Sequence, residues 1–531
     1  MGERFLQPAV PLWDGKPRDD PGAPPRDPRP VRRRLWGVRQ QPTRLARLCH
    51  ELSRVPTAAW VCALVACLNA TSWSFITPPF QVPDEPSHFA YVKQLAETGT
   101  LPTSSKENFS LEELHVLDAL GYGRIRQSPG HPAIFSQAQQ EQLDETLQAD
   151  KRIRETGSPA AGVATSEPPL YYALESIPYD LGSSGTLLDR LQLMRLLSSM
   201  MAGLTALFTF LFVREALPRV RWTSTVGALA VAFSPLFAFT SGGVTPDAML
   251  FAVSAALFYC LARAFRRGLT TPSAIAMGTV IVVGLLTKLN FVGLLPGAFL
   301  ALAIVAVRGK RRDGWRALRA PAIAATLGGV PLVAFLLENA LSDRATFGIA
   351  ADTLRAMHGS ALAVANYVWQ LYLPRLPGTH NDFPGLFTPV QVWFDGYVGR
   401  FGWLDTFFPS WVYTAALVAA AAIAGLLART LIASRAALRS RLAELAVYAI
   451  MTAGVLILVG TDSYRLFPIQ LAGYGQARYL LPLLPLLAAV LALAARAGGR
   501  RWGPVTGVLI VVAFLAHDLF SQLQVVARYY S

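Results

Sequence analysis

Hydrophobic residues in this chain gather into long, almost uninterrupted runs separated by polar segments. Each run approaches the roughly 20 residues that a helix needs to cross a bilayer. This pattern predicts an all-α polytopic membrane protein with about 11 transmembrane helices. The predicted spans are 55–76, 190–213, 223–242, 246–265, 273–290, 291–307, 320–340, 411–428, 443–461, 478–496 and 503–521.

The polar segments divide the chain into three parts. Residues 1–54 are rich in Pro, Arg and Asp and predict a largely disordered, basic cytoplasmic tail. Residues 55–521 form the transmembrane domain, with two large outer loops at 77–189 and 341–410, after the first and seventh helices. We expect these loops to pack on the membrane domain. Residues 522–531 form a short outer C-terminal tail.

The positions of the basic residues predict the orientation. Of the 48 Lys and Arg residues, 12 lie in residues 1–54. When the helices alternate from an inner N-terminus, every short basic loop falls on the inner side, as the positive-inside rule requires. These loops are 214–221, 263–267, 308–312, 429–441 and 496–501. We therefore expect a plasma-membrane protein with a cytoplasmic N-terminus and both large loops outside.

The composition argues against a soluble protein and against a nucleic-acid-binding protein. Only 15% of the residues are charged and 53% are hydrophobic, whereas soluble domains carry roughly 25% charge. The net charge of +14 suggests a nucleic-acid partner, but its distribution is that of a membrane protein, so the predicted partner is the lipid bilayer and not a nucleic acid. The outer loops contain no cysteine, so no disulfide framework is expected there.

The first outer loop opens with adjacent carboxylates, Asp84 and Glu85, framed by Pro83 and Pro86. A carboxylate at this place could act as a general base on an acceptor hydroxyl, which makes both residues candidate catalytic groups. Alternatively, Asp84 caps the helix predicted at 86–98 and Glu85 complements its dipole. The two interpretations are compatible, because a capping position also orients its side chain. A second, polar helix is predicted at 136–156, capped by Ser136.

His88 follows Asp84 by one turn and can share its face. It is a candidate substrate-binding residue, and an interfacial histidine is the alternative. The His, Asp and Glu residues show no tight metal-ligand spacing, so no cofactor is predicted and a divalent metal has no ligand cluster to support it.

Three cations lie at the outer ends of predicted helices: Lys288, Arg478 and Arg400. Charges at such depth are costly and often functional. A guanidinium can bind two phosphate oxygens, so Arg478, with Lys288, is a candidate phosphate-binding residue. The alternative is that these side chains extend to lipid headgroups.

Further polar and aromatic residues are candidates for a substrate pocket. They are Glu167, Tyr171, Tyr172, Asp247, Trp403, Gln476 and Tyr479. Asp247 either caps the next helix or belongs to the site. The aromatic side chains, with Trp393 and Trp411, could stack on sugar faces, although an interfacial aromatic belt explains them equally well.

Five motifs occur in a fixed order along residues 55–521 and resemble a large, poorly characterised family of bacterial membrane proteins. They are P-D-E-P-S-H-F at 83–89, E-P-P-L-Y-Y at 167–172, P-D-A at 246–248, F-G-W-L-D at 401–405 and Q-A-R-Y-L-L-P at 476–482. That family in turn resembles the GT-C glycosyltransferases, which have many membrane helices and an acidic pair just after the first helix.

The GT-C resemblance implies a polyprenyl-phosphate-linked sugar donor and a reaction on the outer face. It makes Asp84 the catalytic base or the acid that positions the acceptor, with Glu85 its neighbour. The expected function is therefore an inverting membrane glycosyltransferase with a glycan or glycolipid acceptor. The alternatives are a transporter or flippase of lipid-linked glycans and a noncatalytic envelope-assembly protein.

Overall fold

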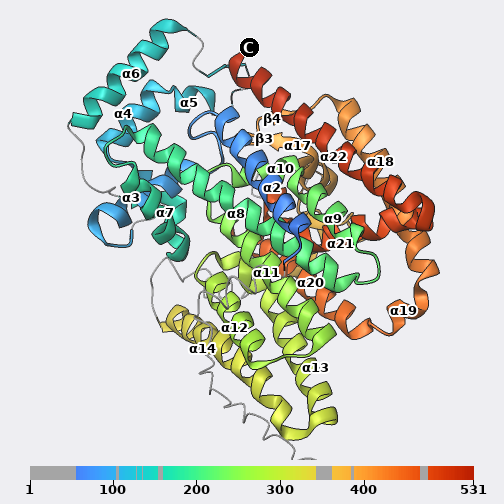
Figure 1. Cartoon of the computed structure of the whole chain (residues 1–531). Coiled ribbons are helices and arrows are strands. Elements are labelled where there is room, and N and C mark those ends of the chain that lie inside the picture. Colours follow the sequence, from blue (N-terminus) through green and yellow to red (C-terminus); the bar gives the residue numbers. More distant parts are fainter. Residues whose placement is uncertain are drawn as a thin grey trace, which may run out of the picture. The chain divides into compact units, whose positions relative to one another are not determined.

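The computed structural model describes residues 55–102, 107–126, 128, 130–133, 136–152, 160–341, 361–383, 388–466 and 476–531. Helices dominate this part of the chain (Figure 1). The predictions for residues 1–54 lie outside the described residues, as does part of the second large loop, 341–410.

In the ranges given above, twelve helices, some long and some short, overlap the predicted spans. They are α2 (Thr57–Ile76), α8 (Leu187–Ala216), α9 (Trp222–Ala232), α10 (Pro235–Ser241), α11 (Pro246–Arg267), α12 (Thr271–Leu285), α13 (Leu295–Asp313), α14 (Arg319–Leu341), α18 (Ser410–Ala433), α20 (Leu442–Leu466), α21 (Leu484–Ala495) and α22 (Gly499–Tyr530). The helix α22 runs through most of the residues predicted as the outer C-terminal tail. Short 3-10 turns, η2 (Leu289–Leu294), η3 (Gly314–Leu318), η5 (Ala477–Leu483) and η6 (Arg496–Gly498), join several of them, and α19 (Arg435–Arg439) precedes α20.

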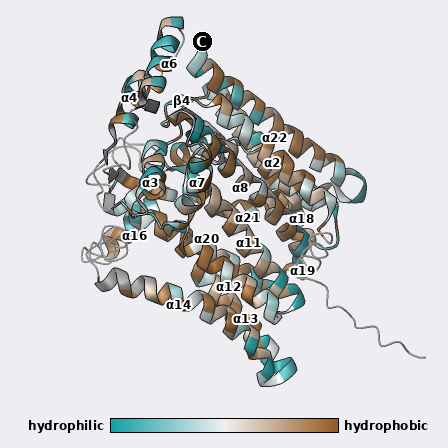
Figure 2. Ribbon diagram, turned by 60° about the vertical axis from the view of Figure 1, so that its left-hand side comes forward, coloured by the Kyte–Doolittle hydropathy of each residue, from teal (hydrophilic) through white to brown (hydrophobic). Residues whose placement is uncertain are grey.

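Seven helical segments in the described residues are long and apolar enough to cross a membrane, or eight if the bent pair α9–α10 is one span. The bend of 62° in this pair falls at Ser234-Pro235, because proline opens a helix and disfavours helical backbone at the residue before it. The all-α polytopic prediction is confirmed, while the number of eleven spans stays a prediction. Figure 2 shows mostly hydrophobic ribbon along α12, α13 and α22, with α13 turning hydrophilic at its end.

The first large loop, 77–189, folds into helices. They are α3 (Glu85–Thr98), α4 (Leu111–Ala119), α5 (Tyr122–Ile125), α6 (Gln137–Arg152), η1 (Gly162–Ser166) and α7 (Leu170–Leu181), with β1 (Glu107–Asn108) antiparallel to β2 (Ala160–Ala161). The predicted polar helix is α6, and the Ser136 hydroxyl accepts a hydrogen bond from the Gln139 amide at 3.2 Å. α6 is largely hydrophilic in Figure 2.

The described part of the second loop holds α16 (Ala361–Tyr372), the π-helical turn η4 (Val390–Asp395), α17 (Gly396–Gly399) and the antiparallel strands β3 (Arg400–Phe401) and β4 (Thr406–Phe407). Both loops join the core of the long helices. Phe80, Phe89 and Val116 of the first loop and Phe401 of the second belong to one hydrophobic cluster with residues of α8, α11 and α22. The loops therefore pack on the helical domain.

Candidate active site

The segment that follows α2 is fixed by Arg195 of α8. Its guanidinium donates to the carbonyls of Ser74, Thr77 and Pro78 at 2.8–3.0 Å. It also pairs with both carboxylate oxygens of Glu85, at 2.8 and 2.6 Å. A guanidinium presents several donors in one plane, so a single side chain can hold this whole turn.

Glu85 is fully buried. Besides Arg195, the amide of Val244 donates to its Oε1 at 2.9 Å. With every close contact directed at anchoring, the geometry gives Glu85 a positioning role for the start of α3. The catalytic role predicted for Glu85 stays a prediction.

Asp84 has left-handed backbone, with φ of 67°, and its side chain makes no capping hydrogen bond. The interpretation of the Asp84 side chain as a helix cap is therefore wrong, because no hydrogen bond joins its carboxylate to the first turn of α3. Its Oδ2 instead meets Nη2 of Arg478 at 2.5 Å, and 29% of the Asp84 side chain is exposed. Phe80 and Leu404 are the other described non-glycine residues with positive φ, and backbone of this kind gathers at functional sites.

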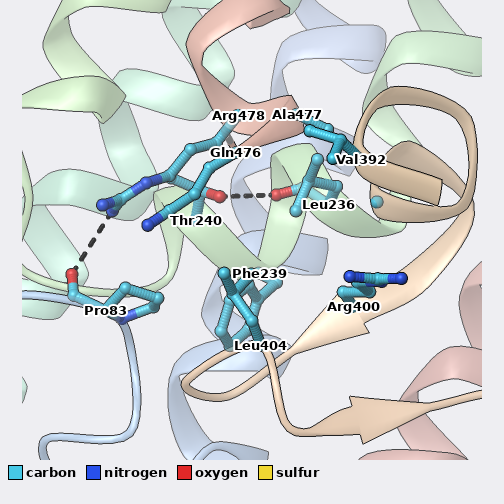
Figure 3. Close-up of a pocket in the computed structure, with 11 residues that line it drawn as sticks. Pro83, Leu236, Phe239, Thr240, Val392, Arg400, Leu404, Gln476, Ala477 and Arg478 are labelled. Atoms are coloured by element: carbon cyan, nitrogen blue, oxygen red, sulfur yellow. Dashed lines mark hydrogen bonds between the residues drawn. The ribbon is translucent and has the colours of Figure 1, made fainter. Parts of the chain in front are cut away.

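Arg478 enters from η5, almost four hundred residues along the chain from Asp84. It also donates to the Pro83 carbonyl at 3.3 Å (Figure 3). Its Nη1 lies 3.7 Å from Oδ2 of Asp247, and its guanidinium lies 5.3 Å from the centre of the Tyr479 ring. Only 5% of the side chain is exposed, so Arg478 links two carboxylates in largely water-excluded surroundings.

Lys288 completes a group that we call the ionic cluster: Asp84, Glu167, Asp247, Lys288 and Arg478. Its ammonium lies 2.9 Å from Oδ1 of Asp247 and 3.6 Å from Oε1 of Glu167. Three carboxylates therefore face two cations. Lys288 lies in the break between α12 and η2 and has extended backbone, so its side chain does not follow the helical periodicity of α12.

Local structure explains the place of Asp247. The hydroxyl of Thr245 accepts from the Asp247 amide at 3.4 Å and caps α11. The predicted choice between cap and site is thus resolved, because Thr245 is the cap and the Asp247 carboxylate faces Lys288.

His88 and Tyr172 lie beside the ionic cluster. The Nδ1 of His88 and the Tyr172 hydroxyl are 2.9 Å apart, and the Tyr172 ring stacks on Tyr91 with centroids 3.7 Å apart. Burial lowers the pKa of His88 to about 3. The ring is therefore a neutral hydrogen-bonding group at physiological pH.

Two acids of the ionic cluster, Asp84 and Glu167, have pKa values shifted in opposite directions. Burial raises the pKa of Asp84, but Arg478 and Lys288 outweigh burial and hold it below its ordinary value. The pKa of Glu167 is raised, chiefly by burial and also by Asp247 and Asp462, against the opposing charge of Lys288. Such opposed shifts within one site are typical of acid–base chemistry.

A pocket opens beside Arg478. It is lined by Pro83, Leu236, Phe239, Thr240, Val392, Gly396, Arg400, Leu404, Gln476, Ala477 and Arg478. Figure 3 shows the Arg478 and Arg400 side chains on opposite sides of this pocket. Within the described residues, Arg478 Nε and Gln476 Oε1 are buried without a hydrogen-bond partner. The pocket thus presents two guanidinium groups, with polar atoms left for a ligand.

Two predicted residues lie outside this arrangement. Trp403 donates from Nε1 to the Phe80 carbonyl at 3.2 Å, and Arg126 stacks on its ring at 3.8 Å. Tyr171 turns to Ser198, with hydroxyls 2.9 Å apart. Trp403 therefore acts in packing the loops.

Two residues that shape the site, Arg195 and Asp462, were not predicted from the sequence. Arg195 lies inside the predicted span 190–213 and is not among the candidate residues predicted from the sequence. Asp462 acts electrostatically on Glu167 and follows the predicted span 443–461, a placement that could have marked it. No group of three His, Cys, Asp or Glu residues in the described part of the chain is placed to hold a metal ion.

Comparison with known proteins gives a family and distant structural relatives. The family model described as "Predicted membrane protein (DUF2142)" matches residues 67–487. No curated protein matches the chain.

The similar solved structures include two of ArnT from Cupriavidus metallidurans. The apo structure is 13% identical, with 83% of this chain and 60% of that chain covered and a TM-score of 0.42. The structure bound to undecaprenyl phosphate is 12% identical, with 89% and 76% covered and a TM-score of 0.41. AglB from Archaeoglobus fulgidus, in complex with an inhibitory peptide and a dolichol-phosphate, is 13% identical, with 89% and 56% covered and a TM-score of 0.42. The chain thus spans less than two thirds of apo ArnT and of AglB, and these similarities are too distant to transfer a site.

Proposed function

We propose that this chain, which belongs to the DUF2142 family of predicted membrane proteins, is a membrane glycosyltransferase that uses a polyprenyl-phosphate sugar as donor. We further propose that transfer takes place on the outer face of the plasma membrane, with inversion at the sugar and a glycan or glycolipid as acceptor. The resemblance of the five sequence motifs motivates the reaction class, and the chemistry of the ionic cluster supports it.

One observation carries the proposal. The partly exposed Asp84 carboxylate lies 2.5 Å from the Arg478 guanidinium, and Arg478 lines a pocket that also holds the guanidinium of Arg400. A carboxylate for the acceptor hydroxyl and cations for the donor phosphate are the two groups that transfer from a lipid phosphate requires. A lipid phosphate needs no acid to leave, so a single base suffices.

In the proposed reaction, the acceptor oxygen forms a bond to the anomeric carbon while the bond from that carbon to the phosphate oxygen breaks. The breaking bond's electron pair stays on the phosphate, which leaves as polyprenyl phosphate. The hydroxyl proton passes to the Asp84 carboxylate. Attack opposite the leaving group inverts the anomeric configuration.

Arg478 links binding to basicity in this scheme. Without donor, its charge lowers the pKa of Asp84 and weakens it as a base. A donor phosphate that takes up the guanidinium compensates this charge and makes the carboxylate more basic. Lys288 and Asp247 hold Arg478 and Glu167 in place, and His88 and Tyr172 supply neutral hydrogen-bonding groups at the edge.

The proposal is tested by reconstituting the purified chain in vesicles and supplying a panel of radiolabelled polyprenyl-phosphate sugars with glycan and glycolipid acceptors. We expect transfer from at least one donor, with an inverted linkage by NMR of the product. A retained configuration would exclude a single displacement by the acceptor hydroxyl with Asp84 as its base. A donor lipid that moves between leaflets without sugar transfer would favour the flippase. This movement is measured as the accessibility of the labelled lipid to an enzyme added outside the vesicles.

A further inference from the structure

A large basic cavity lies at the ends of the helices farthest from the ionic cluster. α8 runs without a break from Arg195, which holds Glu85, to Glu215, which lines the cavity. Twenty residues at 1.5 Å each separate them by about 30 Å. α11 likewise leads from Asp247 to Arg266, about 28 Å apart. These lengths match the roughly 30 Å hydrocarbon core, so the cavity opens at the opposite membrane face.

The cavity has a volume of about 1760 Å³, its open mouth included. Charged groups and hydrophobic side chains share its wall. The charged residues are Arg219, Arg266, Arg308, Arg441, Arg496, Glu215 and Glu444, and the hydrophobic ones include Phe265, Leu431, Leu438 and Leu493. Five arginines therefore face two carboxylates, which leaves three positive charges in excess.

The two carboxylates are already occupied. Glu215 pairs with Arg266 at 2.9 Å and with Arg267. Glu444 accepts from Arg441 at 2.6 and 2.8 Å and from the Tyr448 hydroxyl at 2.9 Å. They leave no carboxylate for the remaining cations of the wall.

Three arginines stay without a carboxylate partner among the residues that the structure describes: Arg219, Arg308 and Arg496. The guanidinium of Arg308 lies over the Phe265 ring, 5.7 Å from its centroid. Arg219 and Arg496 lie close enough for their like charges to interact. Both line the cavity, so their like charges repel each other, and a bound anion relieves that repulsion.

We propose that this cavity binds a phosphate-bearing anion, supplied by the headgroup of an anionic membrane phospholipid. Guanidinium groups match phosphate oxygens in geometry as well as in charge. The apolar side chains beside them suit the glycerol and upper acyl region of a lipid, and basic pockets between membrane helices are known to hold such headgroups. The site is independent of the proposed glycosyl transfer.

The excess of arginine has a simpler explanation in the positive-inside rule, which predicts basic residues here whether or not a cavity exists. The two explanations differ in which arginine matters. If only the overall surface charge matters, all basic residues of this face contribute to lipid binding alike. If the cavity is a binding site, lipid binding depends on the arginines that line it. Arg501 offers a matched control, because it lies at the start of α22 beside Trp502 and does not line the cavity.

The test measures binding of radiolabelled phosphatidylglycerol to the full chain in neutral detergent, with labelled phosphatidylcholine as reference. We expect saturable binding of phosphatidylglycerol alone, weakened about ten-fold or more in the double variant Arg308→Gln/Arg496→Gln and unchanged within about two-fold in Arg501→Gln. Arg219→Gln provides a second cavity variant should the double one unfold, as judged by circular dichroism.

Inorganic pyrophosphate is added as competitor to separate the sources of phosphate. If pyrophosphate does not displace phosphatidylglycerol at millimolar concentration, the phosphate is that of a lipid headgroup. If it displaces the lipid from the wild type but not from the cavity variants, the phosphate chemistry is the same and the ligand comes from the water. The proposal is overturned if Arg501→Gln weakens binding as much as the cavity variants, or if phosphatidylcholine binds equally well.

Discussion

Asp84 combines features that sequence motifs and structure reveal separately. The flanking prolines identify its segment, but no pattern in the sequence predicts the left-handed backbone at Asp84. Its partner, Arg478, lies 394 positions away. Both residues could be nominated from the sequence, because each stands at the outer end of an apolar run. Their pairing could not, since it depends on how distant helices pack.

The Arg478→Lys substitution tests phosphate recognition at the residue scale. Lysine keeps the charge but cannot present two parallel donors. We expect the KM for the donor to rise roughly ten-fold or more, since bidentate recognition contributes on the order of 1.5–3 kcal/mol, while the protein stays folded. The measurement is steady-state transfer at varied donor concentration. An unchanged KM would remove Arg478 from the donor site.

Glu175 makes a pH-dependent contribution to stability. Burial raises its pKa to about 8, although hydrogen bonds from Ser198 and Tyr171 oppose the shift. A carboxyl with a raised folded-state pKa stabilises fully below its unfolded value near 4.5, and this contribution is lost as the pH rises through about 8. Glu175→Gln should therefore unfold at a higher temperature than the wild type at pH 8–9, with an advantage of at most roughly 5 kcal/mol. The measurement is the thermal unfolding of both proteins in detergent at pH 5, 7 and 9. The prediction is contradicted if the unfolding temperatures of Glu175→Gln and the wild type change with pH in parallel.

At the scale of elements, the positions of the long helices followed from the sequence because apolar runs of bilayer length have few other solutions. The break at Lys288 was also predicted, and the structure ends α12 at Leu285 before η2 begins. Arg190 and Arg195 lie within the predicted span 190–213 and are buried in α8. Both pair with acids of the first loop, Glu112 and Glu85, and this pairing makes their burial tolerable.

The contact of Arg195 with Glu85 fixes the start of α3, and Arg195→Met tests it. The variant leaves the fully buried Glu85 without its cation, which costs on the order of 3–5 kcal/mol. We expect a clearly lower unfolding temperature in detergent. The double variant Arg195→Met/Glu85→Gln should recover part of the loss, because no buried charge then remains unpaired. Equal stability of the single variant and the wild type would contradict this anchoring role.

For the whole molecule, the two loops and the C-terminal helix converge near the end of α22. Arg528 donates to the Ser128 carbonyl of the first loop at 2.8 Å and pairs with Asp405 of the second at 3.2 Å. The sequence predicted that the loops pack on the helices, but it gave no indication of which segments meet. Such contacts join residues hundreds of positions apart, and only the packed chain determines them.

Orientation in the membrane is a whole-molecule prediction that rests on the basic loops. In a variant with its four native cysteines replaced, a cysteine at Glu141 of α6 should react with a membrane-impermeant maleimide on intact cells. A cysteine at Ser440, before α20, should react only after permeabilisation. Both positions are exposed. The reverse pattern would place the ionic cluster on the cytoplasmic side and contradict the proposed outer reaction.

The central claim is that the Asp84 carboxylate receives the acceptor proton. The most direct test compares initial rates of sugar transfer by the wild type, Asp84→Asn and the control Asp118→Asn, which removes an exposed carboxylate of the same loop. We predict a fall of about 10²–10⁴-fold for Asp84→Asn, the usual contribution of a general base, with an unchanged rate for Asp118→Asn. Undiminished transfer by folded Asp84→Asn would contradict the account.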